Sequence, residues 1–290
     1  STNKLIDLSS GEGASTILTT AKGRIVDLLL VIHMGDELLV VTSPQTSAKV
    51  VEWIDFYTFG EDIAVEDVTE EAALLSLIGP RSGALLREPV STLDLFGAVQ
   101  TTVQGVELTV IRTDAPGIAG YDLLVPASQA VEVWEGLLND GAVPMGEEAL
   151  EMLRIEQGVP RYGRELGEDF NPLEAGLTPS ISFDKGCYTG QEGVLRLQTY
   201  NKVQRHLAGI AIKDGSPQPG ARLEVDGKAV GQLTSVAHSP KLGHTLALGY
   251  VRAGYAVAGQ EVGIRSGDHL VQGRVLDLPL EKRGPKGNTG

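Results

Sequence analysis

The sequence predicts an α+β fold that is followed by a small all-β module. Strand and helix patterns are interleaved up to about residue 204, without the strict strand–helix alternation of a doubly wound sheet. From about Leu207, short apolar runs are separated by Gly, Pro, Asp-Gly and Ser turns roughly every eight to twelve residues, which is typical of a small barrel. The length of 290 residues suits two domains, which we place at 1–204 and 205–290.

The first domain begins with a strand pattern and a hairpin. An apolar run over 23–32 predicts a strand, Gly35 and Asp36 supply a turn, and 38–42 supplies the pairing strand. The pattern that follows predicts a helix over 48–57, a strand within 65–78 and a helix that starts at Gly79-Pro80 and ends before Pro89. Pro80 suits a first helical turn, where its missing N–H is not needed.

A second cycle of strands and helices follows. Strands are predicted over 106–113 and 121–125, and Ser128 has the character of a helix N-cap. The next helix is expected to end before Gly141 and to carry one apolar face, made of Ala130, Trp134, Leu137 and Leu138. A further helix over 147–157 is expected to bury Leu150 and Leu153.

The second domain contains a strong hairpin signal. Asp226-Gly227 separates two short apolar runs, 221–225 and 229–233, as the two-residue turn of a hairpin does. The polar, glycine-rich tail over 281–290 is expected to be frayed.

Composition excludes several classes of function. The chain carries 24 Lys and Arg against 38 Asp and Glu, a net charge of −14, and no basic stripe of the kind that nucleic acid or an anionic membrane surface requires. A single cysteine cannot form an internal disulfide or supply an all-cysteine zinc or iron–sulfur ligand set. The most apolar stretch, 25–34, has about half the roughly twenty residues of a membrane span. We therefore predict a cytoplasmic protein without nucleic-acid, membrane or metal partners.

Cys187 is the first candidate for chemistry. It lies between Gly186 and Gly190, and Thr189 and Glu192 have the spacing of a capping box, which would place the thiol two residues before a helix cap. The helix dipole and neighbouring Lys185 would favour the thiolate, as in a nucleophile, a redox-active thiol or a soft-metal ligand. The alternative is a small buried hydrophobe.

Asp27 is the second candidate. It stands within an otherwise apolar strand pattern, where an unpaired carboxylate is costly, and groups in such surroundings often serve a site. The alternative is a position at a strand end that faces water.

A third candidate is the loop-rich stretch 153–177. It combines arginines, including Arg154, with Tyr162 and several carboxylates, which could bind a ligand with a flat ring and an anionic tail. The alternative is an ordinary solvated face. The five histidines show no metal spacing, and neither a phosphate-binding loop nor a nucleophile elbow is present.

The run Lys185–Glu192, KGCYTGQE, resembles the signature of YgfZ-type folate-binding proteins, relatives of the glycine-cleavage T-protein, an aminomethyltransferase. The stretches 153–156, 162–163 and 171–177 resemble the central region of that superfamily, and 230–251 resembles its C-terminal barrel. The resemblance implies a cloverleaf of two α/β lobes with a C-terminal small β-barrel and tetrahydrofolate as cofactor. The family's opening segment, before the equivalent of Leu5, has no counterpart here, so we expect part of the first lobe to be missing.

The resemblance also assigns roles to residues. Gly23–Leu28 resembles the strand that carries the T-protein's catalytic aspartate, so Asp27 is expected to face folate. Gly120–Asp122 resembles the segment whose acidic residue holds the pterin. We therefore predict two catalytic residues, Cys187 and Asp27, and a set of folate-binding residues: Asp27, Tyr121, Asp122, Arg154, Tyr162 and Lys185. Asp122 departs from the family, in which glutamate is commoner, and 193–195 also departs.

Three functional hypotheses follow. The resemblance favours a tetrahydrofolate-binding accessory protein for iron–sulfur cluster assembly or repair, with Cys187 acting on client proteins or assembly factors. The alternative is a tetrahydrofolate-dependent one-carbon transferase in which Asp27 positions the attacking folate nitrogen. The third is a non-catalytic interaction protein with a decayed pocket.

Overall fold

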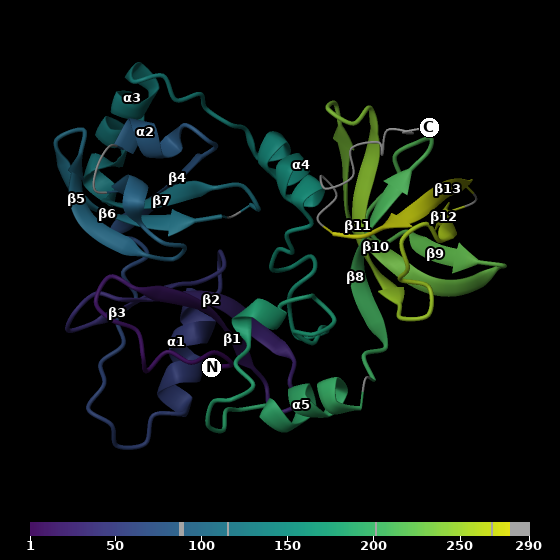
Figure 1. Cartoon of the computed structure of the whole chain (residues 1–290), viewed down its shortest axis with the longest axis horizontal. Helices are drawn as coiled ribbons and strands as arrows, with labels where there is room; N and C mark the ends of the chain where they lie inside the picture. The colour runs from purple at the N-terminus through teal and green to yellow at the C-terminus, as the bar shows by residue number, and fades with distance from the viewer. Residues whose placement is uncertain (87–89, 115, 201, 268, 279–290) are drawn as a thin grey trace, which may run out of the picture. The chain divides into compact units, whose positions relative to one another are not determined.

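The computed structural model describes residues 1–86, 90–114, 116–200, 202–267 and 269–278, with the elements labelled in Figure 1. The predicted frayed tail, 281–290, and Pro89 lie outside this range. The chain forms two compact units: one comprises 1–20, 25–144 and 179–189, and the other 21–24, 145–178 and 190–290. The predicted mixture of α and β elements is confirmed.

The first unit contains an antiparallel sheet of three strands, in the order β1 (Gly13–Thr19), β2 (Ile25–His33), β3 (Leu38–Val41). The predicted hairpin is β2–β3, with Gly35 at φ 99° in its turn. Helix α1 (Ser47–Phe56) follows, and its Val50 packs with Val26 and Leu29. The central position of β2 explains its continuous apolar run, because both its edges are paired and most of its side chains are buried.

A second sheet in the same unit has four antiparallel strands in the order β4-β7-β6-β5. They are β4 (Ala72–Ile78), β5 (Ala98–Val103), β6 (Val106–Thr113) and β7 (Gly120–Pro126). One face is covered by α2 (Ser82–Leu86) and α3 (Ala130–Asn139), with short 3-10 turns at Val90–Thr92 and Ala127–Gln129. The other face contributes Ala98 and Ile111 to a cluster with Ile32 of β2, which joins the two sheets.

Two details of α3 differ from the prediction. The N-cap is Gln129, and Ser128 lies in the preceding 3-10 turn rather than capping the helix. The buried face is Val133 and Leu137, whereas Trp134 is 42% exposed. Val133 and Leu137 lie one turn apart and meet the sheet together, which turns the neighbouring Trp134 about 100° toward solvent.

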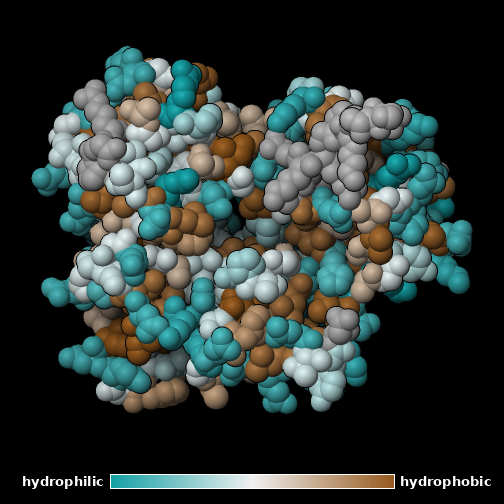
Figure 2. All heavy atoms as spheres, in the orientation of Figure 1, coloured by the Kyte–Doolittle hydropathy of each residue, from teal (hydrophilic) through white to brown (hydrophobic). Residues whose placement is uncertain are grey.

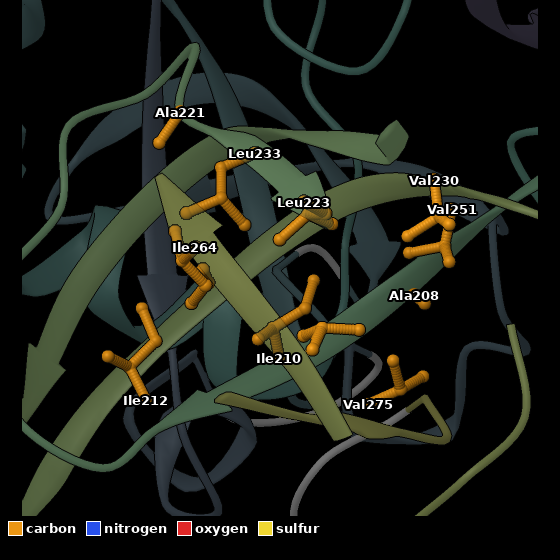
Figure 3. Close-up of a cluster of buried hydrophobic side chains, with 12 residues drawn as sticks. Ala208, Ile210, Ile212, Ala221, Leu223, Val230, Leu233, Val251, Ile264 and Val275 are labelled. Atoms are coloured by element: carbon orange, nitrogen blue, oxygen red, sulfur yellow. The ribbon is translucent and has the colours of Figure 1, made fainter. Parts of the chain in front are cut away.

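The second unit is built on a closed barrel of six strands, in the order β10-β11-β8-β13-β12-β9. Its strands are β8 (Arg205–Ile212), β9 (Arg222–Val225), β10 (Lys228–Ser239), β11 (His244–Arg252), β12 (Glu261–Ser266) and β13 (His269–Leu276). Figure 3 shows side chains from different strands, among them Ile210, Leu223 and Ile264, in one buried cluster. The barrel is confirmed, and closure leaves no free sheet edge.

The predicted turn at Asp226-Gly227 joins β9 and β10. Both residues have positive φ, 50° and 73°, as a type I′ turn requires. Asp and Gly tolerate this conformation better than other residues, which is why this hairpin could be placed from two residues.

Helix α4 (Glu147–Gln157) packs against β10 and β11 of the barrel. The prediction that Leu150 points inward is wrong, since it is 39% exposed, and Leu153 is only half-buried. The buried residues of α4 are Arg154, Ile155 and Glu156. Ile155 joins Leu246 and Leu248 of the barrel wall. Buried polar partners for the two charged residues, described below, determine the orientation of this helix.

Helix α5 (Gln191–Thr199) begins one residue later than the expected cap. Its N-cap is Gly190 in the left-handed region, and no side-chain capping bond is made, so the predicted Thr189 capping box is wrong. The Thr189 carbonyl instead accepts a hydrogen bond from the Thr19 hydroxyl at 2.5 Å. Gly193 lets α5 approach residues 21–24: a Cβ there would stand 2.8 Å from the Lys22 carbonyl oxygen.

Candidate functional site

Asp27 lies on the central strand β2 and has no exposed surface. Its Oδ1 accepts a hydrogen bond from the Leu28 N–H at 2.8 Å. Its Oδ2 accepts one from the Ser43 N–H at 3.0 Å and one from the Thr46 hydroxyl at 2.6 Å. The carboxylate therefore fastens β2 to the loop between β3 and α1, and it does not lie at a strand end facing water.

The donors around Asp27 are uncharged, and one of them, Thr46, stands at the start of a helix. Thr46 is the N-cap of α1, where the helix dipole favours negative charge. Its hydroxyl binds the Asp27 carboxylate rather than capping its own helix. A carboxylate offers about four lone-pair sites. The described residues fill three of them, so one acceptor site of Asp27 is left for a further N–H or O–H donor.

Asp122 lies on β7, on the face of the second sheet that the helices do not cover. It accepts a hydrogen bond from the Ser76 hydroxyl of β4 at 2.5 Å, and the two residues are directly paired across the strands. Burial raises the pKa of the Asp122 carboxyl, and the Ser76 hydrogen bond opposes this only in part. A carboxyl group with a raised pKa suits a polar ligand with both donors and acceptors.

Tyr121, the neighbour of Asp122, faces the opposite side of the same sheet, because successive side chains on a strand alternate. It is buried beneath α2, where its hydroxyl is the nearest atom to a Cβ built at Gly83, at 2.9 Å, and the Arg112 guanidinium lies 5.2 Å from its ring centre. Tyr121 is thus a core residue, and of the predicted pair only Asp122 faces away from the helices.

The segment around Cys187 belongs to the first unit. Cys187 is exposed with a free thiol. Lys185 donates hydrogen bonds to the carbonyls of Ser1 and Asn3, at 2.9 and 3.0 Å, and its ammonium lies 5.7 Å from the ring centre of Tyr188. Burial lowers the pKa of Lys185 and raises that of Tyr188. The cysteine is therefore presented on an anchored turn and is not a buried hydrophobe.

Arg154 lies in a buried network of the second unit. It binds Glu165 at 3.1 Å and the Ser235 hydroxyl at 2.5 Å, and it also pairs with Glu151. Burial pushes the pKa of Glu151 upward, but the hydrogen bonds and charge of Arg154 outweigh this effect and hold it below its usual range. These contacts fasten α4 and the 159–166 loop to the barrel, and folate binding by Arg154 stays a prediction.

Tyr162 is half-buried in the loop that follows α4 and forms an isolated bridge with Leu166. Near it, Phe170 stacks on Tyr250 of the barrel with ring centres 4.4 Å apart. The Arg205 guanidinium lies about 5 Å from both rings. The aromatic and arginine content of this stretch thus serves mainly to hold it against the barrel.

The predicted site residues are distributed over both units. Those of the first unit are Asp27, Tyr121, Asp122, Lys185 and Cys187, and those of the second are Arg154 and Tyr162. Sequence reasoning missed several polar partners: Ser43, Thr46, Ser76, Glu165 and Ser235. Of these, Ser76 left a signal, as a single polar residue in the apolar run of β4. The others become recognisable only through their tertiary contacts.

No group of three or more His, Cys, Asp or Glu side chains within the described ranges is placed to hold a metal ion. Among those same residues, no helix has the length and apolar character needed to cross a membrane.

Two antiparallel sheets and a closed six-stranded barrel define a class of protein, and family comparisons identify it. Residues 1–185 match the GCVT N-terminal domain, and 205–282 match the glycine cleavage T-protein C-terminal barrel domain. The chain therefore belongs to the glycine cleavage T-protein family.

Individual relatives support this family assignment. "Putative transferase At1g60990, chloroplastic" from Arabidopsis thaliana is 35% identical over 95% of this chain, which spans 64% of that protein. An aminomethyltransferase from Halothermothrix orenii is 32% identical over 96% of this chain and 80% of its own length. The crystal structure of the glycine cleavage system aminomethyltransferase T from Bartonella henselae superposes with a TM-score of 0.84, at 23% identity, over 94% of this chain and 77% of that one.

These comparisons confirm the predicted superfamily and fold. They bear out the wider T-protein relationship and leave the YgfZ subtype a prediction, since the named relatives are transferases. The chloroplastic relative likewise leaves the predicted cytoplasmic location untested.

Proposed function

We propose that this chain binds a tetrahydrofolate and transfers a one-carbon group. Several of its relatives carry the name aminomethyltransferase, which denotes a reaction of this class. Membership of the T-protein family supports the class of reaction. The observation that carries the proposal is the Asp27 site: a buried carboxylate held by neutral donors at a helix N-terminus, with one acceptor site left over. Glu165, which helps to hold α4 and its loop against the barrel, is instead paired with Arg154.

Asp27 would act on the folate by accepting one of its N–H groups. Tetrahydrofolate supplies the nucleophilic nitrogen that takes up the one-carbon unit. A carboxylate fixed by three hydrogen bonds has little freedom to reorient, so its remaining acceptor site would orient that nitrogen and accept its proton. Because Asp27 has no exposed surface, the side chains that cover it must move for contact to occur.

Asp122 is the second group of the first unit that we assign to the ligand. A pterin ring offers adjacent N–H donors along one edge, and the Asp122 carboxyl can accept hydrogen bonds from such an edge. Ser76 would fix the orientation of that carboxyl. The two roles differ: Asp122 contributes to affinity, and Asp27 contributes to the rate of transfer.

The test compares Asp27→Asn with Glu132→Gln, an exposed carboxylate on α3 that gives the same change of charge. Calorimetry with tetrahydrofolate and a single-turnover assay with candidate aminomethyl or methyl donors give separate readouts. We expect Asp27→Asn to bind folate within a few-fold of the parent and to lose about 10² in transfer rate or more. Unchanged transfer by Asp27→Asn, or no folate binding by the parent chain, would refute the proposal.

A second candidate function rests on Cys187. The exposed thiol on an anchored turn, inside the motif KGCYTGQE, favours a folate-binding accessory role in iron–sulfur cluster assembly or repair, with client proteins or assembly factors as partners. One thiol per chain suits a transient role rather than stable cluster carriage.

Cys187→Ser separates the two functions. In the accessory role, this variant should bind folate normally but fail to restore the activity of cluster enzymes in cells that lack the protein. In the transferase role, Cys187→Ser should behave as the parent in folate binding and in transfer, whereas Asp27→Asn should bind folate but lose transfer. Equal rescue by parent and Cys187→Ser would exclude the thiol role.

A further inference from the structure

The acidity of this chain is concentrated in one segment. Between Val50 and Pro80 there is no Lys, Arg or His, and there are eight carboxylates: Glu52, Asp55, Glu61, Asp62, Glu66, Asp67, Glu70 and Glu71. The segment comprises most of α1 and the loop that leads to β4. More than half of the net charge of −14 therefore lies on about a tenth of the chain.

The same segment exposes large apolar side chains. Phe56 is 67% exposed, Phe59 80% and Ile63 59%, and Tyr57 and Val65 are each 41% exposed. The ring of Tyr57 lies 5.0 Å from those of both Trp53 and Phe56, which forms an aromatic row at the end of α1. Figure 2 shows hydrophobic and hydrophilic residues side by side on the surface of the chain. Apolar groups gathered in this way are typical of a binding surface.

A groove of about 550 Å³ runs between α1 and this loop. Its lining combines four apolar residues, here called the floor, with three carboxylates, here called the rim. The floor comprises Ala48, Val51, Ile63 and Val65, and the rim comprises Glu52, Asp55 and Asp67. Asp67 is held in place by the N–H and hydroxyl groups of Thr69, and these hydrogen bonds hold its pKa below the usual range. One carboxylate of the rim is therefore preorganised.

We propose that this groove docks a basic amphipathic helix of a partner protein. Lysine and arginine carry methylene stems that cover apolar surface while their charged ends reach out to anions, which matches an apolar floor with an acidic rim. The aromatic row at the end of α1 adds surface on which a cation can rest. Helix α1 has ten residues and is about 15 Å long, so a parallel-lying partner helix would meet it over about three turns.

Charge complementarity selects this occupant over others. A second copy of the chain would bring another net −14 toward the same acidic rim. Nucleic acid and anionic membranes would be repelled in the same way. The surface lies on the first unit and uses none of the residues assigned to folate, so the proposal does not depend on the transferase role.

The test uses three synthetic peptides of eighteen residues as probes. One carries lysine and leucine at helical spacing, the second has glutamate for lysine, and the third has serine for leucine. Binding to the full chain is measured by fluorescence anisotropy at about 50 and about 300 mM NaCl. We expect only the lysine–leucine peptide to bind clearly, and to bind more weakly at the higher salt concentration.

Two double variants locate the binding. Glu52→Gln/Asp55→Asn removes two rim charges and Ile63→Ser/Val65→Ser makes the floor polar, and each should weaken binding about tenfold. These residues are solvent-exposed, so the fold should be retained. The matched control, Glu132→Gln/Glu135→Gln on α3, should change affinity less than about twofold. Equal effects of rim and control variants, equal binding of the serine peptide, or no binding of the lysine–leucine peptide would each overturn the proposal.

Discussion

Two buried carboxylates of this chain, Asp27 and Glu165, show no exposed surface, and each accepts three hydrogen bonds. Glu165 binds the Arg154 guanidinium at 3.1 Å, the Arg161 N–H at 3.0 Å and the Ser235 hydroxyl at 2.6 Å. Asp27 binds two backbone N–H groups and the Thr46 hydroxyl. Glu165 is thus neutralised by a cation, whereas the described partners of Asp27 stabilise it by their dipoles alone.

The difference distinguishes a structural carboxylate from a candidate reactive one. A buried ion pair holds its charges against each other, and breaking it leaves a charge in a poorly solvating interior. A carboxylate held by dipoles keeps its negative potential available to a ligand that brings a proton or a positive charge. The surroundings of Asp27 therefore suit chemistry, and those of Glu165 suit the attachment of α4 and its loop to the barrel.

The largest expected effect comes from breaking the ion pair. Arg154→Met should lower the free energy of unfolding by about 3–5 kcal/mol, because Glu165 loses its cation while it stays buried. Urea unfolding followed by far-UV circular dichroism measures the loss. Arg161→Met is the control, since its guanidinium pairs with Glu147 and Glu151 at the surface, and it should cost less than about 1 kcal/mol. Similar costs for the two variants would mean that burial does not strengthen the pair.

A smaller effect is expected from removing one dipole at Asp27. Thr46→Val keeps the shape of the side chain and deletes a hydroxyl bond to a charged acceptor, which should cost about 1.5–3 kcal/mol. Both tryptophans, Trp53 and Trp134, lie in the first unit, so their fluorescence reports the unfolding of that unit. Thr58→Val, whose hydroxyl donates to the neutral Ile54 carbonyl, should cost about 1 kcal/mol. If Thr58→Val costs as much as Thr46→Val, the Asp27 carboxylate does not depend on its dipoles.

The smallest effect concerns Asp122, which is half-buried and has a single hydroxyl partner. Its pKa is raised in the folded chain, so the folded state holds the proton more tightly than the unfolded state. Stability should therefore fall as the pH rises from the ordinary range of an aspartate through the raised pKa. Asp122→Asn should flatten this part of the profile of unfolding free energy against pH, and Glu135→Gln on the surface of α3 should not. An unchanged slope in Asp122→Asn would place the titrating group elsewhere.

Elements whose signals are local could be predicted from the sequence. The hairpin at Asp226-Gly227 followed from two residues that tolerate positive φ, and the barrel strands followed from regularly spaced turns. For Asp27 the sequence left two alternatives open, a costly carboxylate within an apolar strand and a strand end that faces water, and the structure buries it.

Features that depend on distant partners could not be predicted in this way. The periodicity of α4 favoured Leu150 and Leu153 as buried residues, yet the structure buries Arg154 and Glu156 there. Two distant serine hydroxyls offset the cost of this burial with hydrogen bonds. Ser235, 81 residues from Arg154, bonds to Arg154, and Ser239, 83 residues from Glu156, bonds to Glu156. The Thr189 capping box was wrong because the N-cap of α5 is Gly190, whose left-handed backbone conformation the spacing of Thr189 and Glu192 does not reveal.

The sequence by itself determined the α+β class, the barrel and the family. The signals for them are apolar periodicity, turn residues and long motifs, which are formed by residues close together in the chain. Only the tertiary structure decided which polar residues are structural and which are available for chemistry. That decision depends on whether a buried group meets a cation, a dipole or no partner. Residues far apart in the chain supply those partners, and no local pattern records them.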